Sequence, residues 1–149
     1  MTKTISELRE LWKQRYQEGY FDDGGHLKLH FVTRVDVEPL AIAMRDDRPP
    51  LTRHQLRRFF QHCRFVEQQL KTGDVAWEEA RVDIHRLDNA AADAFGKSPE
   101  NIPELFHDFI CWNVAAAANR KAFLDGFVRH FEALVGFGTR HYAESERER

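Results

Sequence analysis

Apolar residues recur every three or four positions along almost the whole chain, and this spacing constrains the fold more than any other feature. The period matches the 3.6 residues per turn of an α-helix, and no segment sustains the two-residue alternation of a β-strand. The chain has 12 Phe residues, and most of them fall on the apolar side of this pattern. We therefore predict an all-α protein, a single compact bundle of five to six helices with short loops.

Six segments carry the helical pattern, at residues 2–18, 34–44, 52–72, 75–95, 104–118 and 122–137. Pro39 is expected to interrupt or kink the second segment, because proline removes a helix hydrogen bond. Thr52 and Gln55 have the spacing of a capping box, which predicts that the third helix begins after Thr52. A length of 149 residues fits one helical domain over residues 1–149. Within it, residues 1–33 form an N-terminal helix and loop, and the charged tail at 138–149 is expected to fray.

Composition excludes several classes of protein. Hydrophobic residues make up 42% of the chain and charged residues 31%, a balance typical of folded soluble domains rather than disordered ones. No apolar run is long enough to span a bilayer, and the polar N-terminus does not resemble a secretory signal. We therefore expect a cytoplasmic protein. Cys63 and Cys111 lack the spacing of a metal site and are interpreted as buried thiols.

The third predicted helix carries a row of cations, which we call the basic stripe: Arg53, Arg57, Arg64 and Lys71. At 3.6 residues per turn these four side chains point within about 40° of one another. The whole chain has a net charge of −2, so the positive charge is concentrated here, as in nucleic-acid-binding proteins. A solvated helix face is the competing interpretation, and Glu67 beside the stripe weakens its charge. Weaker RNA-binding candidates are Arg81, Arg86 and Arg120.

Two further motifs are candidates for a catalytic or a metal site. Arg57 and His62 have the R-x4-H spacing of HEPN-type ribonucleases, although two residues five apart on one helix point about 140° apart. Glu104 and His107 match half of a di-iron carboxylate signature, but the chain has no second Glu-x-x-His. We therefore expect no catalytic residue, no metal and no cofactor. A small helical HEPN-like ribonuclease, or a protein–protein adaptor without RNA contact, is kept as an alternative.

Two stretches resemble a known family. The first is Leu51-Thr52-x-x-Gln55-Leu56-Arg57-x-Phe59, which is similar to an LTxxQLRxF signature that follows a variable N-terminal helix. The second is IPELFHDFICWN followed by AFLDGFVRHFEALVGF, within residues 102–137. Together they resemble the small subunit of type III-A CRISPR effector (Csm) complexes over roughly residues 34–137. The insertion at 21–31 has no counterpart in the family pattern.

This resemblance implies a role as well as a fold. Such subunits are small helical proteins that stack in several copies along the guide–target RNA duplex and touch its sugar-phosphate backbone. They act in antiviral RNA interference, and neighbouring subunits perform the catalysis. The implied partners are crRNA, target RNA, the backbone repeat-binding subunits, the large polymerase-like subunit and further copies of the chain. The isolated chain is compatible with a homodimer, and no membrane partner is expected.

Overall fold

The computed structural model describes residues 2–97 and 101–145, and this part of the chain is helical throughout, apart from its turns and one loop. Its six α-helices are α1 (Ile5–Glu18), α2 (Arg34–Asp46), α3 (Arg53–Thr72), α4 (Trp77–Gly96), α5 (Glu104–Ala116) and α6 (Val128–Gly138). Extended pairing within the described residues is limited to one antiparallel bridge between Phe21 and Leu27. The predicted all-α bundle is therefore confirmed. No described helix combines the length and the apolar character needed to cross a bilayer.

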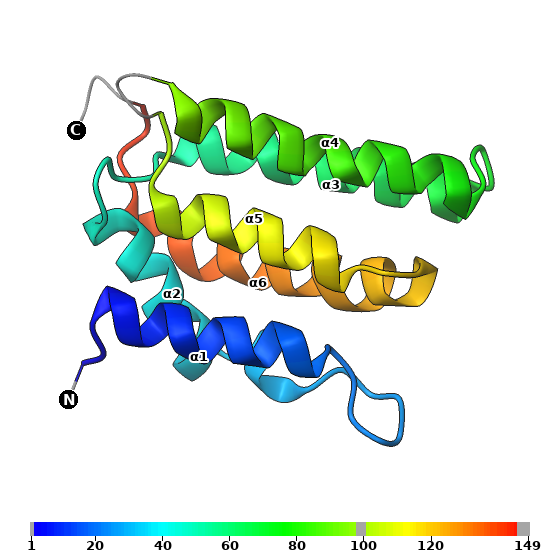
Figure 1. Cartoon of the computed structure of the whole chain (residues 1–149), viewed down its shortest axis with the longest axis horizontal. Coiled ribbons are helices and arrows are strands. Elements are labelled where there is room, and N and C mark those ends of the chain that lie inside the picture. Colours follow the sequence, from blue (N-terminus) through cyan, green and yellow to red (C-terminus); the bar gives the residue numbers. More distant parts are fainter. Residues whose placement is uncertain (1, 98–100, 146–149) are drawn as a thin grey trace.

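The helices are arranged as three stacked pairs (Figure 1). α3 and α4 form one outer pair and α5 and α6 form the middle pair, while α1 and α2 lie on the opposite side, where α1 packs on α5 and α2 packs on α6. The middle pair contacts both outer pairs, since α4 packs on α5, α2 packs on α6, and α3 also reaches α6. The outer faces of α3 and α4 therefore remain open to solvent.

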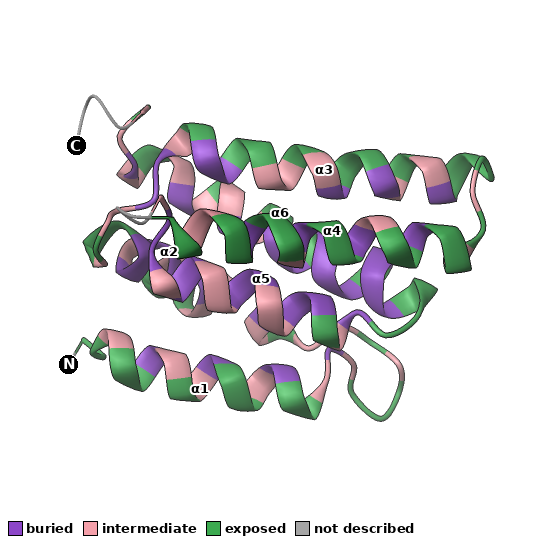
Figure 2. Cartoon of the chain, turned by 45° about the horizontal axis from the view of Figure 1, so that its top comes forward, coloured by how far each residue is buried: buried purple, intermediate pink, exposed green. Residues whose placement is uncertain are grey.

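The core is unusually rich in aromatic rings. Buried residues line the inward sides of the helices, and exposed residues line the outward sides (Figure 2). Trp12 of α1 is fully buried, and its ring stacks on His130 of α6 with centroids 5.1 Å apart. Around this pair lie fully buried phenylalanines from η1 (Leu29–Phe31), α5 and the final helical segment: Phe31, Phe106, Phe109, Phe123, Phe127 and Phe131. Burial of these rings is the main force that holds the three pairs together.

Both ends of α3 are fixed by local chemistry. The Thr52 hydroxyl accepts a hydrogen bond from the Gln55 backbone N–H at 3.2 Å, and the Gln55 side chain accepts one from the Thr52 N–H at 3.0 Å. This confirms the predicted capping box. The helix ends at Gly73, whose φ of 79° lies in the left-handed region that favours glycine. The start of α3, and with it the direction of every side chain along the helix, is thereby set.

Two helices differ in detail from the prediction. α2 continues through Pro39, from Arg34 to Asp46, so the helix is not interrupted there. The last predicted helix does not begin as a regular α-helix, because Ala122–Phe127 forms a π-helix that leads into α6. The wider π turn lies where the ring of Tyr20 approaches the backbone of Gly126, and a Cβ atom built there would lie 2.6 Å from that ring.

The predicted fraying of the tail at 138–149 does not describe its first part. Gly138 still belongs to α6, and Thr139–His141 forms a short 3-10 helix, η3. Tyr142 is buried, and its hydroxyl donates to the Ala41 carbonyl of α2 at 2.7 Å. Residues 146–149 lie outside the described residues. The charged composition of this segment predicts fraying, but the burial of Tyr142 holds its first part against α2.

Candidate nucleic-acid interface

The basic stripe lies on the side of α3 that faces α6. This placement follows from Arg64, whose guanidinium lies 3.3 Å from the Glu132 carboxylate of α6. Between 36% and 60% of each of the four stripe side chains is exposed to solvent. The capping box and the regular helix therefore bring the four predicted cations onto one accessible face.

Each cation of the basic stripe has a carboxylate partner. The Glu144 carboxylate of the tail forms an ion pair with Arg53 at 3.2 Å and accepts a hydrogen bond from Arg57 at 2.7 Å. Glu67 accepts from Arg64 and from Lys71, both at 3.0 Å. Among the described residues, the stripe therefore combines four positive charges with three negative charges, those of Glu67, Glu132 and Glu144.

These ion pairs lower the positive potential of the stripe but are weak individually. Solvent-exposed pairs of this kind contribute about 0–1 kcal/mol each, since water screens the charges and long side chains lose freedom. A phosphate oxygen that approaches the stripe can replace a carboxylate at a similarly small cost. The stripe is thus a surface where anionic partners are exchangeable.

Two of the stripe arginines are also held in place by contacts other than ion pairs. The Arg53 Nε donates to the Tyr142 carbonyl at 2.8 Å. The Arg64 guanidinium lies over the Phe60 ring, 5.3 Å from its centroid. Such contacts restrict the rotamers of the side chains before any ligand arrives, which reduces the entropy lost on binding.

The three weaker candidates do not join the stripe. Arg81 and Arg86 lie on α4, 3.6 Å from Glu78 and Asp83 respectively. Arg120 is exposed at the start of the final helical segment and has no ion pair within the described residues. The connection that carries it and the α3–α4 turn lie at the same end of the molecule (Figure 1). The structure therefore distributes the seven predicted residues over three places.

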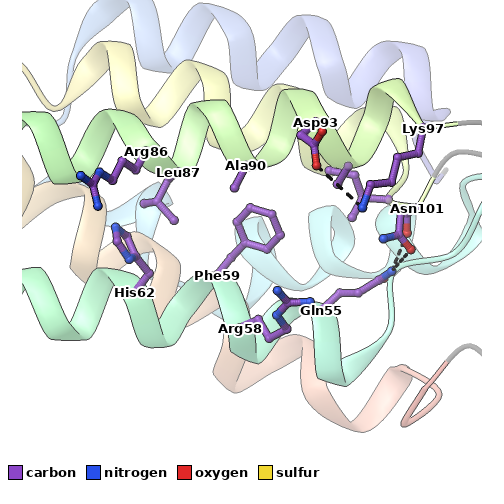
Figure 3. A pocket seen from close by; sticks show the side chains of 12 residues that line it. Gln55, Arg58, Phe59, His62, Arg86, Leu87, Ala90, Asp93, Lys97 and Asn101 are labelled. Carbon is purple, nitrogen blue, oxygen red and sulfur yellow. Dashed lines mark hydrogen bonds and ion pairs between the residues drawn. The ribbon is translucent and has the colours of Figure 1, made fainter.

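A groove between α3 and α4 was not predicted from the sequence. Its cavity measures about 340 Å³, and Figure 3 shows its lining residues. We define the α3–α4 groove by its polar and aromatic lining: Gln55, Arg58, Phe59, His62, Arg86, Asp93, Lys97 and Asn101. Arg58 and His62 are four residues apart on α3, so the sequence shows that they share one face of the helix. It does not show that this face lies against α4.

The ribonuclease and di-iron motifs are not assembled. Arg57 points to Glu144, whereas the His62 ring donates from Nε2 to the Asp83 carbonyl at 2.8 Å, on the α4 side. Glu104 pairs with Arg9, and the His107 ring stacks on Phe95 with centroids 4.8 Å apart. Within residues 2–97 and 101–145, no three His, Cys, Asp or Glu residues come together as a metal site.

Comparison with known proteins identifies the family. A model of the family described as Csm2 Type III-A matches residues 37–145, which is most of the chain and includes the basic stripe, the α3–α4 groove and the first part of the tail. No curated protein and no solved structure matches the chain. The family match confirms the resemblance noted for the two sequence motifs. The chain belongs to the Csm2 type III-A family and is a small subunit of a type III-A CRISPR complex.

Proposed function

We propose that this subunit is a non-catalytic scaffold that binds guide and target RNA through backbone contacts during antiviral RNA interference. The observation that carries the proposal is the exposed basic stripe on α3, in a chain whose family belongs to an RNA-guided complex. A subunit that serves every guide must not depend on base sequence. Contacts to phosphate and sugar meet that requirement, because they carry no sequence information.

The geometry of the basic stripe suits a phosphate backbone. Arg53 and Lys71 are 18 residues apart, which corresponds to about 27 Å along α3 at 1.5 Å per residue. Arginine predominates in the chain, with 16 Arg against 6 Lys. Its planar guanidinium matches phosphate oxygens and stays charged at all physiological pH values.

The carboxylates along the stripe make a single copy a weak binder. RNA must displace Glu67, Glu132 and Glu144 from their cations, so part of the attraction is cancelled. Several copies bound along one RNA gain affinity from linkage, since each later contact is effectively intramolecular. Function therefore depends on assembly with crRNA, with the other subunits and with further copies of this chain.

Binding of labelled oligouridylate to the purified protein tests the role of the stripe. The variant to compare is the triple substitution Arg57→Gln, Arg64→Gln and Lys71→Gln, which leaves Arg53 to support the tail. We expect an affinity loss of about tenfold or more at about 50 mM salt. The log–log salt slope should fall by about 0.7 for each phosphate contact removed.

A matched control is Arg45→Gln. Arg45 is also a half-exposed arginine in an ion pair, 3.0 Å from Asp46, but it lies on α2. Its loss should leave RNA affinity unchanged.

Equal RNA affinity of the folded triple variant and the wild type would show that the stripe is not the RNA-binding site. RNA cleavage by the wild type that disappears in His62→Ala would favour the ribonuclease, and the absence of any RNA binding would favour the adaptor.

A further inference from the structure

The α3–α4 groove is a second cationic surface, separate from the basic stripe. Arg58 points about 100° around α3 from Arg57, so the groove opens on another side of the helix. Arg58 and His62 line it from α3, and Arg86 and Lys97 line it from α4. In Figure 3 the Phe59 ring lies between the two helices, in the middle of the groove.

The cations of the groove are paired more loosely with carboxylates than those of the stripe. Arg58 is exposed and has no ion pair within the described residues. Arg86 and Lys97 are 69% and 56% exposed, and their carboxylate partners lie at 3.6 and 3.7 Å, longer than the 2.7 to 3.3 Å of the stripe. Among the described residues, three permanent cations of the groove stand against two carboxylates, Asp93 in the lining and Asp83 beside Arg86. The groove therefore keeps one net positive charge, as the stripe does, and its cations are held less closely by carboxylates.

His62 makes a polar link across the groove. Because a backbone carbonyl accepts hydrogen bonds, the contact of His62 Nε2 with the Asp83 carbonyl fixes the imidazole as a donor that ties α3 to α4. This link adds to the packing that holds the two helices, and the backbone positions of their cations, next to each other. A preformed site of this kind loses little freedom on binding.

An exposed aromatic ring extends the same side of α3. Phe65 stands seven residues after Arg58, which returns it to nearly the same direction around the helix. It is 57% exposed, unusual for a phenylalanine in a chain that buries so many others. The ring is therefore accessible to a ligand, about 10 Å along α3 from Arg58 at 1.5 Å per residue.

We infer that the α3–α4 groove binds single-stranded RNA, with phosphates on Arg58, Arg86 and Lys97 and a base stacked on Phe65. Cations that follow the backbone, next to an aromatic platform, are how proteins bind single strands without reading sequence. An acidic protein segment could use the cations but would gain nothing from the ring. The inference rests on the proposed function and adds a site outside the basic stripe.

Fluorescence anisotropy with the full chain and a labelled oligouridylate of about 15 nucleotides tests this site. The groove variant is Arg58→Gln, Arg86→Gln and Lys97→Gln, and it is compared with the stripe variant and with Arg45→Gln. We expect the groove variant to lose about tenfold or more in affinity at about 50 mM salt, with a salt slope lower by about 2. Phe65→Ala should lose about fivefold or more with an unchanged salt slope, since stacking releases no counterions.

Asp93→Asn tests the site in the opposite direction, because it removes the carboxylate of the groove lining and should raise RNA affinity severalfold.

A groove variant that folds and binds RNA like the wild type, while the stripe variant loses affinity, would overturn the inferred groove site and leave the proposed function intact. Absence of RNA binding by the wild type would overturn both. Groove-dependent binding of polyglutamate, with RNA binding unaffected, would assign the groove to an acidic protein instead.

Discussion

At the scale of single residues, His130 is a fully buried polar side chain whose two ring nitrogens are both bonded. Its Nδ1 lies 2.7 Å from the Phe31 carbonyl, and its Nε2 lies 2.8 Å from the Tyr16 hydroxyl. Since the carbonyl accepts, Nδ1 carries the proton, and Nε2 accepts from the hydroxyl of Tyr16. The neutral imidazole is thus fully bonded in the core, whereas a second proton would place a positive charge in apolar surroundings.

This arrangement makes stability depend on pH. Burial lowers the pKa of His130 from 6.5 to about 4, although the Phe31 carbonyl acts in the opposite direction. Below pH 6.5, His130 binds a proton in the unfolded chain but stays neutral in the folded chain. The free energy of unfolding therefore falls as the pH drops towards 4. The loss from this group should reach about 3 kcal/mol.

Urea unfolding at several pH values checks this expectation, with His130→Gln as the comparison. The variant should be less stable at neutral pH and should show a smaller decline between pH 6.5 and pH 4. Ring nitrogen chemical shifts should report a neutral His130 at pH 5.5. A ring that becomes charged in the folded protein near neutral pH would contradict this account.

At the scale of elements, the entry to α6 depends on one glycine. The buried Tyr20 hydroxyl donates to the Asn113 side chain at 2.7 Å, which holds its ring against Gly126 in the π-helix. The ring has no room to retreat, because it is anchored at one end and buried. The π turn and the loop before η1 are therefore fitted to each other.

Alanine substitutions at two glycines should have opposite effects. Gly126→Ala places a methyl group against the Tyr20 ring and should lower the free energy of unfolding by about 1–3 kcal/mol. Gly136→Ala, in the exposed interior of α6 with no atom within 4 Å of the new Cβ, should raise it by about 0.5–1 kcal/mol. Denaturant titration measures the free energy of unfolding of both variants. The same change in both would contradict the close packing of Tyr20 on Gly126.

The helices were predictable because their signals are local. Periodicity and the pair Thr52 and Gln55 determine α3 from nearby residues alone, and Glu67 was visible beside the stripe for the same reason. Glu132 and Glu144 reach the stripe from α6 and the tail, and no local pattern shows such contacts. The α3–α4 groove likewise exists only after two helices dock. The π-helix depends on Tyr20, which is distant in sequence.

At the scale of the whole molecule, charge placement matters more than net charge. The chain is slightly acidic, yet it carries two cationic surfaces on different sides of α3. The tail adds to this pattern, because its Ala143 and Glu144 carbonyls accept from the Arg53 and His54 N–H groups at 2.9 and 3.1 Å. Glu144 is thereby held against one end of the stripe.

Removal of that single carboxylate should strengthen RNA binding. Glu144→Gln changes the formal net charge from −2 to −1 and releases Arg53 and Arg57 for phosphate, so affinity should rise about threefold or more at low salt. Glu10→Gln makes the same change of net charge at an exposed position on α1. A similar gain in both variants would indicate a long-range field rather than local competition, and anisotropy titrations separate the two.

Three sides of α3 have separate roles, and this restricts where related proteins can carry insertions or deletions. The inner side of this helix packs in the core, one flank carries the stripe, and another flank lines the groove. A single inserted residue would rotate every later position by about 100° and would misplace all three at once. Insertions and deletions among relatives are therefore expected in the turns or before residue 33, and not within α3.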